Sequence, residues 1–365
     1  MRPAKNVIYP SITPAVTSGD TSVRITFPFR HLNHSFTISV PASLYEGAKS
    51  SGKSARVPAG IGDAWLAGYY AAFVEDPSLT SFYRTLLSGM RKIRSAQNYD
   101  DDDYLEMLAA FVQSIPYDTE KVASIDRAPR FPVETVVDSR GICSDKSLLL
   151  AGLLSHEGYA VAILQFTAEN HVAVGIPVQD GYDFRGCGCA VIESTAISYV
   201  GDAEGEFPAG DGSMRVLASR PKVFFVGHGS KRYGSITEIS RILAVRSTLK
   251  EKLSETGDLV TMIKTQEEKI TRDKEALTVS RESLSCLEAE TAKLSDDAEL
   301  FAAKYASYKK SVASHNARVT GLAKQIERYN AAVDEYNRLA AVAGFIQHNR
   351  LDRRSVSAKI QNMQL

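Results

Sequence analysis

The stretch that decides the fold is "DSRGICSDKSLLLAGLLSHEGYAVAIL", which runs from Asp138 to Leu164. It places Cys143 directly after a turn that contains Gly141 and directly before a run of helix-forming leucines. Gly158 then supplies a stop signal for that helix. The residues that follow are apolar and β-branched, as in a strand. The stretch therefore predicts a helix that begins near a cysteine and leads into a β-strand.

A cysteine at the start of a helix lies in a positive field, because the first backbone N–H groups are unpaired and the helix dipole is positive there. That field favours a thiolate over a thiol. The same N–H groups can receive the negative charge that develops on an attacked carbonyl oxygen. Ser144 and Asp145 suit the first helical turn. Cys143 is therefore a candidate nucleophile, and a buried, inert cysteine is the structural alternative.

A nucleophilic thiol needs a base and a group that orients the base. "TAENHVAVGIPV" supplies His171 where a turn enters a predicted strand, and "CAVIEST" supplies Glu193 near the end of another strand. Taken singly, a strand histidine and a strand-end glutamate are usually structural. Neighbouring strands would bring the carboxylate to one imidazole nitrogen and leave the other nitrogen facing the helix start. The chain order Cys143, His171, Glu193 therefore predicts a catalytic triad.

The segments around this stretch show the mixed pattern of an α+β fold. Residues 22–40 predict two strands joined by a short turn, and residues 47–60, "GAKSSGKSARVPAG", predict a mobile loop. Helical spacing in "AWLAGYYAAFV" and "DYLEMLAAFVQSIPY" predicts two helices. "NHVAVGIPV", "CAVIES" and "KVFFVG" predict further strands. We expect a helix packed on an antiparallel sheet.

These motifs resemble the transglutaminase-like domain of archaeal and bacterial proteins. The resemblance runs roughly from Ser22 to Asp202 and is strongest in "RFPVET", "GICSDKS", "LLSHEGY" and "HVAVG". It implies a papain-like core with a triad of cysteine, histidine and an acid. By position, it assigns the nucleophile to Cys143 and the base to His171.

The resemblance also implies an acid in an Asp-x-Thr pattern, which falls on "EST" and so on Glu193 with Thr195. Glutamate is longer than aspartate by one methylene. The family's oxyanion helper is an upstream Trp or Gln, for which Gln113 is the candidate here, beside the backbone N–H of Cys143. We expect Asp145 and Thr195 to support the site.

The composition changes near Val245, after which proline disappears and glycine becomes rare. Apolar residues then recur in heptads, which is typical of a coiled coil. The two lines of the seam are Ile263, Ile270, Leu277 and Leu284, and Leu287, Leu294, Phe301 and Tyr308. An unbroken register through "AKLSDDAELF" favours one long rod, whose seam would need a partner chain and give a homodimer. Ser295 could instead cap a second helix and make a hairpin.

The sequence thus predicts four parts. Residues 1–60 form a β-hairpin region and a flexible loop, and residues 61–245 form the transglutaminase-like catalytic domain. Residues 246–345 form the helical coiled coil. Residues 346–365 form a basic tail, expected to be disordered.

The bulk composition excludes some classes of function. The chain has 365 residues, with Lys+Arg 43 against Asp+Glu 43, so no net charge draws it to nucleic acid. The N-terminus lacks the apolar core of a signal peptide, and no run of residues is apolar enough to span a membrane. We therefore expect a cytoplasmic protein without a membrane span. No cofactor or metal site is predicted.

Four cysteines are too few for a disulfide framework, so free thiols are expected. Cys187 and Cys189 form a C-x-C motif just before Glu193. The motif could join a metal site or resolve an oxidised Cys143, but two thiols lack the four-ligand set of a structural zinc site. Packing in a strand is the favoured interpretation.

The predicted function is thiol-dependent acyl transfer on a peptide or side-chain amide, through a thioester on Cys143. The protein would be a peptidase, isopeptidase or deamidase if water is the second nucleophile, and a crosslinking enzyme if a lysine amine is. Its partner is then a protein or peptide substrate. The alternatives are a non-catalytic scaffold that carries a degenerate domain on a coiled coil, and a redox-sensing thiol protein.

Overall fold

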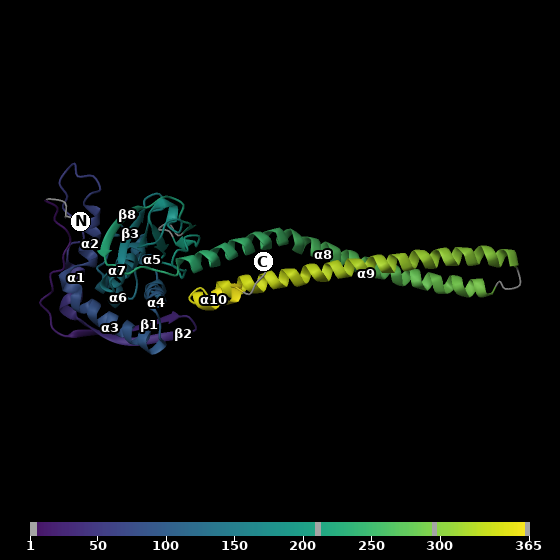
Figure 1. Ribbon diagram of the computed structural model, residues 1–365, viewed down its shortest axis with the longest axis horizontal. Coiled ribbons are helices and arrows are strands. Elements are labelled where there is room, and N and C mark those ends of the chain that lie inside the picture. The colour runs from purple at the N-terminus through teal and green to yellow at the C-terminus, as the bar shows by residue number, and fades with distance from the viewer. Residues whose placement is uncertain (1–5, 209–212, 294–297, 362–365) are drawn as a thin grey trace. The chain divides into compact units, whose positions relative to one another are not determined.

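The computed structural model describes residues 6–208, 213–293 and 298–361 (Figure 1). Two compact units are present. The first comprises Met1–Ala244 together with Asn349–Leu365, and the second comprises Val245–His348. The predicted mixed fold with antiparallel sheets and a long helical C-terminal part is confirmed.

The main sheet of the first unit has four antiparallel strands in the order β5-β4-β3-β8. Their bounds are β3 Ala160–Phe166, β4 His171–Pro177, β5 Cys189–Ile192 and β8 Lys222–His228. All four strands were predicted from their β-branched content. The two-residue strands β6 (Phe207–Pro208) and β7 (Met214–Arg215) pair with each other and were not predicted.

Helix α7 (Cys143–His156) packs on this sheet and begins at the predicted cysteine. Its leucines are buried, which explains why a helix in the centre of the unit is apolar on most of its surface. Gly158 ends it with φ 85°, a left-handed backbone that residues with a Cβ rarely adopt. The predicted helix and its stop signal are both confirmed.

The predicted N-terminal strands are present as β1 (Asp20–Phe29) and β2 (Leu32–Pro41). The predicted loop at 47–60 is wrong in its first residues, because α1 (Ala42–Ser50) extends through them. Glycine is needed at position 47 of this helix, because an added Cβ would clash with the backbone of residues 13–15.

Further helices surround the core of the first unit. Those at "AWLAGYYAAFV" and "DYLEMLAAFVQSIPY" were predicted, and the others were not. The bounds are α2 Leu66–Val74, α3 Thr80–Gln97, α4 Asp101–Ser114, α5 Thr119–Ala123 and α6 Pro132–Val137, with 3-10 helices η1 Pro77–Leu79 and η2 Phe184–Gly186.

The second unit is a helical hairpin, formed by α8 (Ile236–Ala292), which starts in the first unit, and α9 (Ala298–His348) (Figure 1). Lys304 Nζ lies 3.0 Å from Glu290 Oε2, and His315 Nδ1 lies 3.1 Å from Ser280 Oγ. The contacts of α9 thus move toward the start of α8 as the residue number in α9 increases, so the two helices are antiparallel.

The single continuous rod is therefore wrong for this chain. Seam side chains such as Ile270 and Leu322 are buried within the hairpin, and others such as Leu277 and Leu284 are half-buried, so each helix covers part of the other's seam. Leu294 and the predicted cap Ser295 lie outside the described residues, as does the side chain of Ile263. Among the helices that are described, none is both long enough and apolar enough to cross a membrane.

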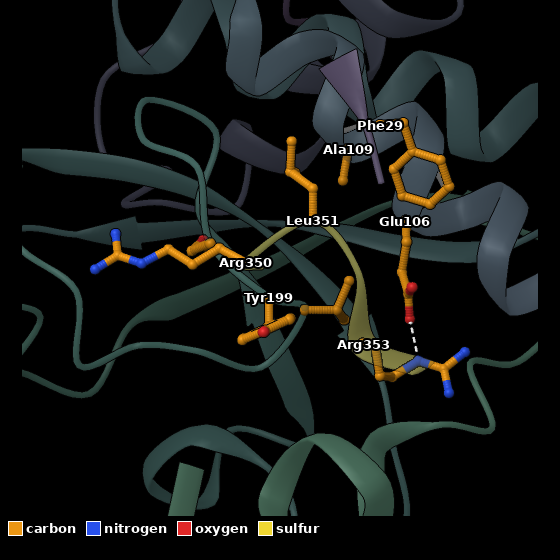
Figure 2. Close-up of a pocket in the computed structure, with 9 residues that line it drawn as sticks. Phe29, Glu106, Ala109, Tyr199, Arg350, Leu351 and Arg353 are labelled. Atoms are coloured by element: carbon orange, nitrogen blue, oxygen red, sulfur yellow. Dashed lines mark hydrogen bonds and ion pairs between the residues drawn. The ribbon is translucent and has the colours of Figure 1, made fainter. Parts of the chain in front are cut away.

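The C-terminal residues return to the first unit and form α10 (Arg353–Gln361). The expected disordered tail is therefore wrong. Arg353 is buried, and its Nε donates a hydrogen bond of 2.6 Å to Glu106 Oε1, as Figure 2 shows. The Tyr199 hydroxyl donates to the backbone oxygen of Asn349 at 3.0 Å. A basic sequence is ordered here because its charges meet buried carboxylates instead of solvent.

Candidate active site

The first turn of α7 is fixed by Asp145, whose buried carboxylate accepts four hydrogen bonds. Two come from the backbone N–H groups of Ile142 and Arg130 at 3.1 and 2.8 Å, and Lys121 Nζ donates to both carboxylate oxygens at 2.8 Å. Gly141 is needed on spatial grounds, because an added Cβ would lie 3.0 Å from the Asp145 Cβ. Asp145 therefore supports the turn that presents Cys143 and does not itself face the groove.

His171 is the first residue of β4, and Glu193 follows directly after β5, its neighbour in the sheet. His171 Nε2 lies 2.8 Å from Glu193 Oε2, and both side chains are buried. The other carboxylate oxygen accepts hydrogen bonds from the backbone N–H and the hydroxyl of Thr195, at 2.7 and 2.6 Å. Both carboxylate oxygens of Glu193 are thus hydrogen-bonded. The glutamate side chain, although one methylene longer than an aspartate, reaches the imidazole.

His171 and Cys143 line the same groove, and the Cys143 side chain contributes to the raised pKa of the imidazole. Because Glu193 occupies Nε2, Nδ1 is the nitrogen left for the thiol. The structure thus brings together Cys143, His171 and Glu193, the three residues that the sequence analysis predicts as a triad.

Electrostatics favour a charged imidazole. Burial lowers the pKa of His171, but the Glu193 carboxylate, its hydrogen bond to the imidazole and the nearby Cys143 side chain outweigh burial and raise it to about 10. Burial likewise raises the pKa of Glu193, yet His171 and the Thr195 hydrogen bonds hold it below its usual range. The pair is therefore an imidazolium and a carboxylate at neutral pH.

Phe207 is a site residue that sequence reasoning missed. Its ring stacks on His171 with 3.9 Å between ring centroids and an interplanar angle of 29°. It belongs to a buried cluster with Phe166 and Val191. The stack restricts rotation of the imidazole plane, in addition to the hydrogen bond between Nε2 and Glu193. A two-residue strand carries no periodic signal, so nothing in the pattern marked Phe207.

Gln113 lies elsewhere than an oxyanion helper requires. Its Nε2 donates to the backbone oxygens of Glu193 at 2.8 Å and Ser198 at 3.1 Å. Both amide hydrogens are therefore used, and none is left for an oxyanion. Its buried side chain holds the segment that follows β5 and so supports Glu193. Gln113 is therefore no longer the candidate donor to the oxyanion.

Lys146 is a second buried polar residue that the sequence did not mark. Its Nζ donates to the backbone oxygens of Ile115 at 2.6 Å and Gln113 at 3.2 Å, near the end of α4. Burial lowers its pKa to about 8. The local sequence "SDKSLLL" indicates a solvated side chain at Lys146. Its structural role arises only from the packing of α7 against α4.

A groove of about 370 Å³ opens over Cys143 and His171. Aromatic side chains form much of its wall. The aromatic lining residues are Tyr69, Tyr70, Tyr117 and Phe166. Tyr117 pairs with Gly141 in an isolated parallel bridge, close to the first turn of α7. Burial and the charge of Cys143 raise the pKa of Tyr117, so its hydroxyl is a protonated donor at neutral pH.

The C-x-C motif lies outside this groove. Cys189 is fully buried in the cluster with Phe207, and the Cys187 thiol donates to the backbone oxygen of Cys189 at 3.3 Å. Within the described residues, no three metal-binding side chains form a group that could hold an ion. The position of Cys189 fits the strand-packing interpretation of the motif.

Comparison with known proteins gives one match. A family model described as a transglutaminase-like domain matches residues 93–184. The matched residues include Cys143 and His171, and Glu193 lies beyond their end. This region of the chain is therefore similar to a transglutaminase-like domain. No curated protein and no solved structure matches the chain.

Proposed function

We propose that the protein is a thiol-dependent acyl-transfer enzyme that acts on peptide or side-chain amides. The observation that carries the proposal is that Cys143 and His171 line one groove, with Glu193 Oε2 2.8 Å from His171 Nε2. The similarity to a transglutaminase-like domain supports the same class of chemistry.

In the first step the Cys143 thiolate attacks the amide carbon, and the bond to nitrogen breaks to leave a thioester. The His171 imidazolium gives its proton to the departing amine. His171, now neutral, then removes a proton from the second nucleophile, which attacks the thioester and releases Cys143. Glu193 orients the imidazole through Nε2 and stabilises its charge in both steps.

The experiment that tests this function is a screen of glutamine-containing peptides, each incubated with and without a fluorescent primary amine. Mass spectrometry separates a cleaved backbone, a deamidated side chain and an amine adduct, and so identifies the second nucleophile. No product with any peptide, together with a Cys143 that reacts no faster than an ordinary thiol, would favour the non-catalytic scaffold instead.

Glu193→Gln is expected to lower kcat/KM on the order of 10³-fold, because the amide cannot balance the imidazolium charge and favours the wrong tautomer. Glu193→Asp keeps the charge but shortens the side chain, so it is the matched control and should lose less activity. A Glu193→Gln enzyme with wild-type turnover would remove Glu193 from the triad.

Tyr117 replaces Gln113 as the side-chain donor to the oxyanion, beside the N–H groups at the start of α7. Tyr117→Phe is expected to lower kcat about 10²-fold with little change in KM, because one donor to the transition state is lost. Tyr69→Phe is the control, since Tyr69 also lines the groove but donates to the backbone oxygen of Lys53 at 2.9 Å. Equal kcat values for the two variants would contradict the role of Tyr117.

A further inference from the structure

Arg127 stands out among the residues that line the groove. It is the only arginine or lysine among the described residues that line the groove. It lies on the exposed segment between α5 and α6, on the same groove as Cys143. Among the described residues that line the groove there is no aspartate or glutamate, so no carboxylate of this lining offsets the charge of Arg127.

The cations nearest to Arg127 in the sequence form ion pairs. Arg127 Nε donates to the backbone oxygen of Ser124 at 3.1 Å. In the part of the chain that the structure describes, no carboxylate forms an ion pair with its guanidinium. The paired cations are Lys121 with Asp145 at 2.8 Å, Arg130 with Asp118 at 2.7 Å and Arg140 with Glu120 at 2.6 Å.

The charge of Arg127 acts within the reactive part of the groove. The Tyr117 hydroxyl is affected by both neighbours, since the Cys143 charge raises its pKa and the Arg127 charge lowers it. Tyr117, Cys143 and Arg127 all line the same groove. A peptide whose amide carbon is at Cys143 would pass along the tyrosine rings with a neighbouring group near Arg127.

We propose that Arg127 forms an anion subsite that binds a carboxylate of the acyl-donor peptide, close to the amide that Cys143 attacks. A guanidinium offers a planar pair of donors that matches a carboxylate, and the absence of acidic lining residues leaves that pair for the substrate. The subsite rests on the proposed function, since it selects the peptides that react with the thiol.

The test compares alkylation of Cys143 by iodoacetate, which carries a carboxylate, with alkylation by neutral iodoacetamide. The rate at Cys143 is followed by peptide mass spectrometry, so the other cysteines do not interfere. Arg127→Gln should lower the iodoacetate-to-iodoacetamide rate ratio about fivefold, the size expected for one charge in a partly solvated groove. Arg127→Lys keeps the cation and should retain most of the ratio.

Arg84→Gln is the control for net charge, because Arg84 is exposed on α3 and does not line the groove. Its ratio should equal that of the wild type. An unchanged ratio in Arg127→Gln would overturn the subsite while leaving the thiolate chemistry intact. A Cys143 that reacts slowly with both reagents in the wild type would overturn the proposed function and, with it, the subsite.

Three matched peptides then identify the source of the carboxylate by protecting Cys143 from iodoacetamide. One carries a glutamate side chain and an amidated C-terminus, one a glutamine and a free C-terminus, and one a glutamine and an amidated C-terminus. Stronger protection by the first or second peptide, lost in Arg127→Gln, assigns a side-chain or a terminal carboxylate. No advantage of either carboxylate over the third peptide would contradict the proposal.

Discussion

The Cys143→Ala protein is expected to keep its fold and to lose acyl-transfer activity by roughly 10⁴- to 10⁶-fold, because the thiolate forms the covalent intermediate. Cys143 is partly exposed at the start of α7, and the groove gives the shorter side chain room. The substitution therefore removes the nucleophile with little loss of packing. The measurement is kcat/KM on a peptide that the wild type converts, with circular dichroism as the check on folding.

Cys286→Ala is the matched control for this prediction, because Cys286 is an exposed cysteine on α8. It should retain wild-type activity. If Cys143→Ala retained most of the activity while Cys286→Ala lost it, the nucleophile would lie on α8 and the triad would be rejected.

The Arg353→Ala protein is expected to lose about 3 to 5 kcal/mol of unfolding free energy, because the substitution leaves the largely buried Glu106 carboxylate without its ion-pair partner. Arg353 Nε donates to Glu106 at 2.6 Å, and its NH2 lies 3.3 Å from Asp103. Its NH1 also pairs with Glu238 at the start of α8. Burial raises the pKa of Glu106, and Arg353 opposes that rise, so its loss makes the carboxylate harder to keep charged.

Fluorescence of Trp65, the one tryptophan of the chain, reports unfolding of the first unit, where Arg353 also lies. The urea midpoint should fall markedly in Arg353→Ala and much less in Arg353→Lys. Arg338→Ala is the control, because its pair with Glu335 on α9 is exposed. A midpoint in Arg353→Ala that matched this control would show that the C-terminal segment does not stabilise the first unit.

The sequence revealed those parts of the site that depend on local pattern. A cysteine before leucines fixes a helix start, and β-branched runs fix the strands that carry His171 and Glu193. Because strands that follow one another in the chain often pair in a sheet, the sequence was enough to predict that His171 and Glu193 lie close together. These inferences needed only the periods of helices and strands.

Other parts depend on contacts between distant residues, which a single sequence does not display. Phe207 reaches His171 from a strand of two residues, and Arg353 meets Asp103 across 250 positions. Gln113 was assigned by residue type, but its amide is consumed by two backbone oxygens. A polar side chain reveals its role only when its partners are known.

The helical part illustrates a different limit. A heptad seam is the same whether it packs on a second chain or on its own continuation, so the pattern could not separate the rod from the hairpin. Contacts such as Lys304 with Glu290 decide between them, and they depend on where the chain turns.

The most direct test of the central claim is the rate at which iodoacetamide alkylates Cys143 near pH 6, compared with Cys286 in the same molecule. If His171 and Glu193 hold Cys143 as a thiolate, Cys143 should react on the order of 10- to 100-fold faster than Cys286. That advantage should disappear in His171→Ala. Equal rates at the two cysteines in the wild-type protein would contradict the account.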